Sequence, residues 1–424
     1  GPTPGHADDD YFHPFNLPYG GEAPGLLPFW LDAAGAPGRP AWADASTSQE
    51  AVIRAGKGPK RAGDPDFSGP MNYAYHFDAA RLAAYLRGKA VAAGVERIEA
   101  TIGDVTRGED GDILSISPND GRAPIEGEFF IDCSGFRALL IGDTLGSPFK
   151  PVGDTLFNDR AVAIQLPYET PDAPIAPYTQ ATAHDAGWIW DIGLSQRRGT
   201  GCVYSSAHMD EDAAEATLRA YLGPQADAIT ARHLRFRTGY REQQWIGNCV
   251  AVGLSAGFFE PLESTGIMLI EIAARMLSEI LPGADRAALA AASRHYNRML
   301  PPRFAAITEF LKLHYCLSKR RDTPYWRDNT DAASIPEGLA DKLAQWRHRL
   351  PSRFDFVVDH ETFLPASWSY ILYGMGFETP APPISDASAA DANTTFAKVR
   401  AATAQAIAVL PGHRALLDHY RQIS

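Results

Sequence analysis

The chain has 424 residues, of which 45% are hydrophobic and 21% charged, enough apolar sequence for one large domain or two joined ones. Its formal net charge is -12, which argues against general nucleic-acid binding. No stretch reaches the roughly 18 uninterrupted apolar residues of a membrane span, and no signal-peptide pattern is present. The cysteines lie far apart and lack metal-ligand spacing, which favours reduced thiols in a cytoplasmic protein over disulfides and predicts no metal site. These cysteines are Cys133, Cys202, Cys249 and Cys316.

Residues 1 to about 70 are rich in Pro, Gly and aromatic residues, which predicts an ordered but irregular surface. The spacing of apolar residues then predicts a helix that begins after Asp78 and ends at Gly94. Two strands are predicted next, at residues 98–105 and 113–117.

Short apolar segments bounded by Gly, Ser and Asp predict further strands. A helix is predicted from about Met268 to Ile280, and another from about 286 to 317. Because strands come first and helices last, we expect a sheet-bearing cofactor domain at 1–285 and a helical cap at 286–424. The predicted strands are residues 129–131, 161–165, 187–192, 201–205, 233–240 and 249–252.

The segment from Gly253 to Ile267, with the sequence GLSAGFFEPLESTGI, joins the last of these strands to the helix. The first amides of a helix have no internal partner and carry the positive end of the helix dipole. Thr265 and Gly266 offer such amides, and the missing Cβ of Gly266 lets an ion or ring approach. Glu263 lies just outside, and Ser264 is the candidate N-cap. The alternative interpretation is an ordinary strand-to-helix turn.

Three other motifs are candidates for binding. Residues 132–135, Asp-Cys-Ser-Gly, end an apolar strand, where glycine permits backbone contact with a dinucleotide. Trp188 and Trp190 share one face of a strand and form either a rigid wall or plain core. The aromatic cluster at residues 11–15 suits stacking on a flat ring, or it only anchors a loop-rich segment.

Together these motifs resemble the flavin-dependent tryptophan halogenase family. Residues 253–267 resemble the signature of that family, and 314–326 resemble the end of its long C-terminal helix. Residues 187–192, GWIWDI, resemble its Trp-x-Trp-x-Ile-Pro motif, with Gly193 in place of the usual proline, which predicts a looser backbone there. Residues 253–257 also fit the Gly-x-Ser-x-Gly elbow of hydrolases, but the Asp and His context is not evident.

The resemblance covers nearly all of this chain, but it does not include the first segment of the family's sequence. That segment carries a strand, a Gly-x-Gly-x-x-Gly phosphate loop and an essential lysine, and no such loop or lysine precedes His13. The implied fold is α/β, a two-dinucleotide-binding-domain flavoprotein of the FAD monooxygenase type with a mostly helical C-terminal substrate subdomain. Residues 1–285 would then form the FAD-binding domain, without its first strand and phosphate loop, and 286–424 the substrate-capping subdomain.

The resemblance also implies a reaction. FADH2, O2 and chloride or bromide would form hypohalous acid, which halogenates an electron-rich aromatic such as indole or tryptophan. A separate NADH-dependent flavin reductase would supply FADH2. A homodimer stays open, since the sequence does not set the oligomeric state. Two alternatives stay open as well: a flavin-dependent aromatic hydroxylase of the same fold, and a non-catalytic flavoprotein fragment.

Site roles follow from the same resemblance. Thr265 and Gly266 would hold the halide, while Glu263, which faces the substrate, and Ser264 form the catalytic set. Trp368 either lines the substrate pocket or belongs to the core. The remaining assignments are Ile102, Asp132, Gly135, Gly253, Leu254 and Ile267 for FAD; His13, Phe15, Glu263 and Trp368 for substrate; and Trp188, Trp190, Phe259 and Pro261 for the flavin or tunnel wall.

Overall fold

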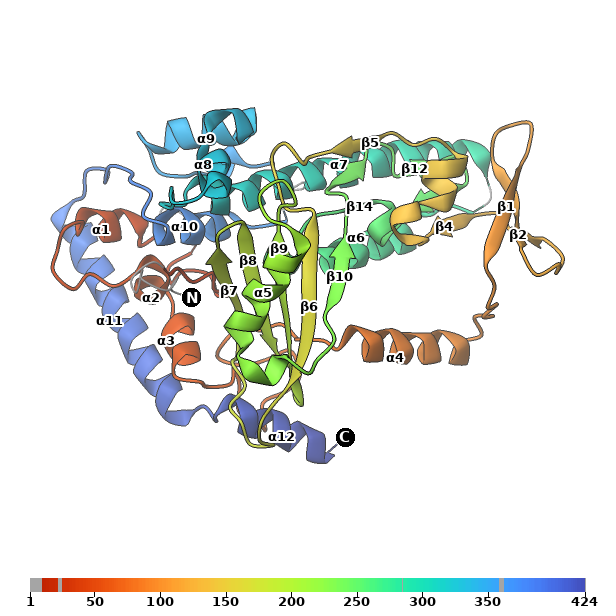
Figure 1. Cartoon of the computed structure of the whole chain (residues 1–424). Helices are drawn as coiled ribbons and strands as arrows, with labels where there is room; N and C mark the ends of the chain where they lie inside the picture. The colour runs from red at the N-terminus through yellow and green to blue at the C-terminus, as the bar shows by residue number, and fades with distance from the viewer. Residues whose placement is uncertain (1–9, 22–24, 284, 358–361, 424) are drawn as a thin grey trace. The chain divides into compact units, whose positions relative to one another are not determined.

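The computed structural model describes residues 10–21, 25–283, 285–357 and 362–423 (Figure 1). The chain divides into two compact units, each built from segments far apart in the sequence. The first unit comprises residues 1–76, 160–234 and 309–424, and the second comprises 77–159 and 235–308. This division is one of compactness, and the predicted functional boundary at residue 285 stays a prediction.

The first unit contains a five-stranded sheet with the order β10-β6-β9-β8-β7, in which β6, β9, β8 and β7 pair antiparallel. Helix α5 (Glu211–Leu222) covers one face of this sheet (Figure 1). It begins at Asp210, whose carboxylate accepts the Ala213 amide, and it buries Leu218 and Leu222 against the sheet. The strands are β6 (Arg160–Pro167), β7 (Thr179–His184), β8 (Gly187–Gly193), β9 (Arg197–Tyr204) and β10 (Arg232–Arg235).

An aromatic core holds the helices of the first unit together. Trp42, Trp346, Trp368 and Tyr370 are among its largest fully buried side chains. The first 70 residues contribute Trp42 to this core and Val52 to a separate cluster with Met71, Ala406 and Leu410, so the expectation of an irregular surface was wrong. Their helices are only five or six residues long, too short for a periodic pattern to show in the sequence. The helices are α1 (Leu27–Asp32), α2 (Trp42–Ser46), α3 (Gln49–Arg54), α8 (Pro324–Thr330), α9 (Glu337–Trp346), α10 (Pro365–Gly374), α11 (Asp386–Val409) and α12 (His413–Ile423).

The second unit contains three small sheets. In one, β13 (Cys249–Ala251) pairs parallel with β4 (Phe130–Asp132) and antiparallel with β12 (Trp245–Ile246). Parallel pairing brings the carboxyl ends of β13 and β4 to the same edge. The other sheets are β14-β11-β5, of Gly257–Phe258, Gly239–Arg241 and Phe149–Pro151, and β1-β2-β3, of Ile102–Arg107, Ile113–Pro118 and Ile125–Glu126.

Helices complete the second unit largely as the sequence predicts. Helix α4 (Ala79–Ala92) begins after Asp78, whose carboxylate accepts the Arg81 amide. Its side chains Tyr85, Leu86 and Val91 are exposed. Helix α6 (Thr265–Ile280) follows the segment GLSAGFFEPLES. Helix α7 (Arg286–Cys316) begins in the second unit, and its last residues belong to the first.

The predicted strand at 233–240 is two strands, β10 and β11, which join different sheets. Between them Phe236 donates to the Asp159 carbonyl, and the Val152 amide donates to the Thr238 carbonyl. The sequence alternates apolar and polar residues through this change of sheet, so its pattern does not reveal the break.

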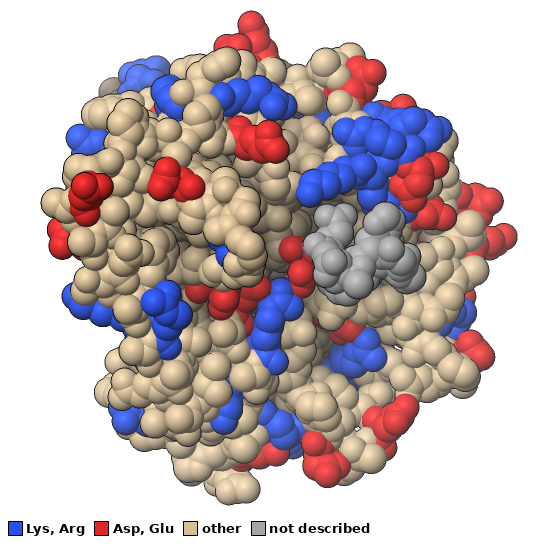
Figure 2. Space-filling view, turned by 90° about the vertical axis from the view of Figure 1, so that its left-hand side faces the viewer, with Lys and Arg blue, Asp and Glu red and all other residues tan. Residues whose placement is uncertain are grey.

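Acidic and basic side chains are interspersed on the face drawn in Figure 2. Within the described ranges, no helix combines the length and the apolar run that crossing a bilayer requires. All four cysteines are free thiols.

Candidate functional site: a strained turn at the start of helix α6

The segment that precedes α6 is compact because two glycines let its backbone pack closely. Gly253 follows β13 and has a φ of +74°, a left-handed value that glycine adopts without steric cost. A Cβ on Gly257 would lie 2.6 Å from the Tyr240 Cβ and 2.8 Å from the Gly239 carbonyl oxygen. The backbone at residue 257 therefore requires glycine, and this packing sets the path of the chain toward the helix.

Two consecutive non-glycine residues just before α6 are left-handed. Glu263 has φ 62° and ψ 9°, and Ser264 has φ 54° and ψ 34°. Only Phe67 and Ala138 share a positive φ among the other described non-glycine residues. Such conformations cost on the order of 1–3 kcal/mol each and persist only where surrounding structure fixes them. The strain therefore lies on the two residues assigned to catalysis.

Ser264 occupies the cap position of α6, but its hydroxyl makes no capping bond with any described residue. The predicted capping role was therefore wrong. A capping side chain requires an extended backbone at its own position, whereas the left-handed backbone of Ser264 directs the side chain elsewhere, and the residue is exposed. The first amides of α6 are therefore not covered by a Ser264 cap.

A buried polar group lies immediately before the strained turn. The Glu260 carboxylate is almost fully buried and accepts a hydrogen bond from the Asn158 side-chain amide. The Asn158 carbonyl in turn accepts the Thr238 hydroxyl at 2.9 Å. Leu262 and Thr265 are buried on either side of Glu263 and Ser264. These contacts fix both ends of the turn, which explains how it holds two left-handed residues.

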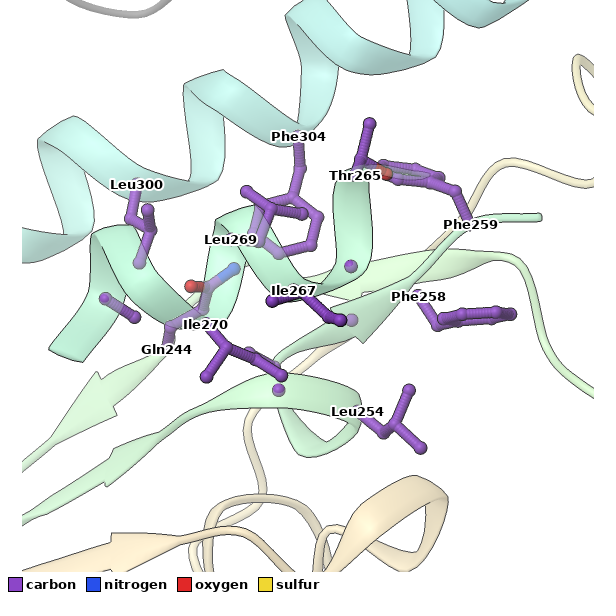
Figure 3. Close-up of a pocket in the computed structure, with 15 residues that line it drawn as sticks. Gln244, Leu254, Phe258, Phe259, Thr265, Ile267, Leu269, Ile270, Leu300 and Phe304 are labelled. Atoms are coloured by element: carbon purple, nitrogen blue, oxygen red, sulfur yellow. The ribbon is translucent and has the colours of Figure 1, made fainter. Parts of the chain in front are cut away.

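A cavity of about 210 Å³ lies beside the start of α6 (Figure 3). Leu254 and Ile267 line it and are 42% and 53% exposed, so both present apolar surface that a ring can cover. Nothing lies within 4 Å of the position that a Cβ on Gly266 would occupy, so approach to that backbone is open. The Gln244 side chain also lines the cavity. The sequence gives no sign of this, because Gln244 ends a run of four polar residues, 241–244, that is typical of exposed surface.

Asp132, at the end of β4, has a carboxylate that is already fully engaged. It accepts the Leu140 and Ile141 amides at 2.9 and 2.8 Å, as well as the Ser134 amide and hydroxyl. Its side chain therefore shapes the turn that follows, in which Gly135 is left-handed with φ +73°. Ile102 is the first residue of β1 in the same unit.

The tryptophan motif lies on β8 in the first unit. The rings of Trp188 and Trp190 are 6.4 Å apart and meet edge to face. Trp190 lies over Gly201 of the paired strand β9, where a Cβ would come within 2.1 Å of the indole. Glycine at 201 is therefore what lets the indole lie flat on the sheet.

Gly193, which replaces the usual proline, is tightly packed rather than loose. Its missing Cβ would lie 2.7 Å from the Ile175 Cγ2, and its carbonyl lies 3.0 Å from the His76 Nδ1. The expected looser backbone was therefore wrong, because neighbouring side chains close around the position.

The structure separates the predicted substrate residues of the first unit. The His13 ring lies 5.8 Å from Phe310 and 6.2 Å from Phe363. Phe15 is 64% exposed, whereas Trp368 is 0% exposed and packs 5.1 Å from Phe310. These contacts favour the interpretation that Trp368 belongs to the core. His13 lies beside the same aromatic cluster, whereas Phe15 is mostly exposed. The other wall residues lie in the second unit, where Phe259 is buried against Tyr240 and Phe304, and Pro261 precedes the strained turn.

The sequence pattern of the tryptophan halogenase family matches residues 5–390. The chain belongs to the tryptophan halogenase family. It is 42% identical over 354 residues to a 7-chloro-L-tryptophan 6-halogenase of Kutzneria sp. (strain 744), covering 82% of this chain and 67% of that protein. It is 40% identical to a tryptophan 6-halogenase of Streptomyces toxytricini, covering 78% of this chain and 63% of that protein. The chain thus spans about two thirds of the length of these halogenase relatives.

Solved structures of halogenases have the same fold as this chain. A tryptophan halogenase from Shewanella frigidimarina matches with a TM-score of 0.93 at 38% identity, covering 98% of this chain and 79% of that one. A flavin-dependent halogenase from Brevundimonas sp. matches with a TM-score of 0.85 at 37% identity, covering 97% and 82%. These matches confirm the predicted family, the flavin-dependent halogenases, and the predicted fold class.

Proposed function

We propose that this protein halogenates an electron-rich aromatic substrate of the indole or tryptophan type, using FADH2, O2 and chloride or bromide. The proposal rests mainly on the backbone conformation at the start of α6. There, two left-handed residues lead to helix amides that the Ser264 side chain does not cap and that lie beside an open glycine.

In this proposal the halide is held by backbone alone. The Thr265 and Gly266 amides would be the donors; Thr265 is buried, and the approach to Gly266 is open. The helix dipole favours an anion at this end. Neither amide titrates, so the halide site itself keeps its charge preference over the working pH range.

The residues around the cavity fit a flavin. Leu254 and Ile267 offer apolar surface to a flat ring. The Gln244 amide, which has no hydrogen-bond partner among the described residues, is the polar group closest in kind to what the ring edge needs. Reduced FAD, when bound, supplies the oxygen chemistry that converts halide to hypohalous acid. In this assignment Asp132 and Gly135 shape the turn after β4 that lies against the cofactor, and Gly253 shapes the turn after β13.

Glu263 is the proposed catalytic carboxylate. Electrophilic substitution places positive charge on the aromatic ring, and a fixed carboxylate stabilises that charge more than it stabilises the neutral substrate. The left-handed backbone of Glu263, fixed by its buried neighbours, orients this group before substrate binds. In the first unit, His13 supplies a flat ring for stacking, and Trp188 and Trp190 supply a wall.

The proposal includes a separate NADH-dependent flavin reductase as the source of FADH2. It also includes a cytoplasmic setting, which the four free thiols support.

The test is to incubate the protein with FAD, a flavin reductase, NADH and bromide in air, with indole or tryptophan as substrate. Mass spectrometry should reveal a product with the bromine isotope doublet, and Glu263→Gln should remove it. Glu271→Gln, an exposed carboxylate on α6, is the matched control and should keep activity. A hydroxylated product formed without halide would instead identify an aromatic hydroxylase, and the absence of both products would refute the proposal.

A further inference from the structure

Gln244 has a side chain that is buried without a hydrogen-bond partner. It is 0% exposed, and neither its amide nitrogen nor its amide oxygen has a partner among the described residues. Its backbone, in contrast, is fixed on both sides: its N–H donates to the Asn297 side chain at 2.9 Å, and its carbonyl accepts the Ala251 amide at 2.7 Å. Unpaired buried polar groups are costly and rare, so this one requires an explanation.

The side chain lines the cavity beside α6. In Figure 3 the Gln244 amide projects toward the part of the cavity around Leu269, Ile267 and Ile270. Leu300 and Phe304 of α7 also line it, so the walls near the amide are apolar. The amide is therefore an isolated polar group behind otherwise apolar walls. Because it is 0% exposed, a ring in the cavity reaches it only when a lining side chain moves aside.

A water molecule would be bound poorly in this cavity. A buried water needs two to four polar partners, and apolar cavities tend to stay dry. A flat ring satisfies the walls by contact and the amide by hydrogen bonding. The volume of about 210 Å³ is below the roughly 300–1,000 Å³ of sites that enclose a whole drug-sized ligand. The cavity therefore suits one end of a larger planar molecule.

The chemistry of a carboxamide narrows the ligand further. It presents a donor beside an acceptor, and its complement is a ring edge on which an N–H lies beside a C=O. We propose that Gln244 recognises the pyrimidinedione edge of the flavin ring, its oxygen accepting the ring N–H and its nitrogen donating to a ring carbonyl. This inference rests on the proposed flavin-dependent function and assigns Gln244 the role of selecting and positioning the ring.

Binding of lumichrome, a flavin ring without the ribityl and nucleotide parts, tests the inference on the full chain. Fluorescence titration should give binding to the wild type and a roughly 10- to 100-fold weaker affinity for Gln244→Leu, the loss of two hydrogen bonds. Lumichrome methylated at the pyrimidinedione N–H should bind the wild type and Gln244→Leu equally weakly. Gln243→Leu, an exposed neighbour, is the matched control and should bind like the wild type.

Stability separates this role from a structural one. Gln244→Leu removes an unpaired polar group, so the ligand-free variant should melt at or above the wild-type Tm. A lower Tm with unchanged lumichrome affinity would mean that the amide is satisfied inside the protein, and would overturn the inference.

The two proposals fail separately. Equal lumichrome affinity in wild type and Gln244→Leu, alongside normal bromination, would refute the role of Gln244 and leave the halogenase function standing. Gln244-dependent binding without any halogenated product would refute the function and keep the ring site. No lumichrome binding by the wild type would overturn the inference outright.

Discussion

The backbone that enters α6 carries strain that a single substitution releases. A left-handed conformation costs a non-glycine residue about 1–2 kcal/mol, and Ser264 adopts one with φ 54°. Its exposed side chain makes no capping bond with any described residue, so removing it loses little. Glycine adopts this conformation freely but loses about 0.5–1 kcal/mol more backbone entropy on folding. Ser264→Gly should therefore raise the free energy of unfolding by about 0.5–1 kcal/mol.

Urea unfolding followed by tryptophan fluorescence measures this change, provided that the m value is unaltered. The matched control is Ser278→Gly, an exposed position in an ordinary turn of the same helix, which should lower the free energy of unfolding by about 0.5 kcal/mol. Ser264→Ala should stay within about 0.5 kcal/mol of wild type. The reasoning is refuted if Ser264→Gly falls in stability as Ser278→Gly does. It is also refuted if Ser264→Ala loses the roughly 1 kcal/mol typical of a lost cap.

Three further predictions concern other parts of the site. Gly201→Ala places a Cβ within 2.1 Å of the Trp190 ring and should cost about 1–3 kcal/mol and change the near-UV circular dichroism; an unchanged spectrum would contradict the described packing. Asp132→Asn replaces one carboxylate oxygen, which accepts two backbone amides, with an NH₂ group that can only donate. The free energy of unfolding in urea should fall by about 2 kcal/mol or more. An unchanged free energy of unfolding would mean that the turn does not need the carboxylate. Burial lowers the pKa of His184 from 6.5 to about 4, so the unfolded state binds more protons between these values. Stability should therefore fall by up to about 3 kcal/mol as the pH drops from 6.5 to 4, and His184→Asn should flatten that dependence in pH-resolved melting.

The strained backbone before α6 and a buried polar side chain both lie in the second unit. Glu263 and Ser264 carry unfavourable backbone angles, and beside the same helix Gln244 carries an amide that no described residue pairs with. Each lowers the stability of the ligand-free chain. A ligand that pairs with the Gln244 amide would recover part of that cost, which is the pattern expected where a protein preorganises a binding site rather than optimises its own packing.

Local signals in the sequence predicted the elements with strong caps or periodicity, whereas α5 and the helices after residue 323 were not placed individually, and the strand predicted at 98–105 begins only at Ile102. Asp78 begins α4 and Gly94 follows its end, because a capping carboxylate and a left-handed glycine act within a few residues. Helices α6 and α7 and the strands β6, β8 and β9 are long enough for their periodicity to stand out. The three short helices before residue 55 were missed because five or six residues do not complete enough turns to establish a period.

The sequence by itself determined the family, the α/β class and the position of a helix start suited to an anion, because these depend on residue order and short-range geometry. Tertiary structure alone decided that Ser264 is left-handed, that Trp368 lies in an aromatic core and that close packing holds Gly193. It also decided that, within the described part of the chain, Ser264 makes no capping bond and the Gln244 amide has no partner. Each of these depends on atoms brought together from distant parts of the chain, and the burial of one side chain by others leaves no mark on its own local sequence.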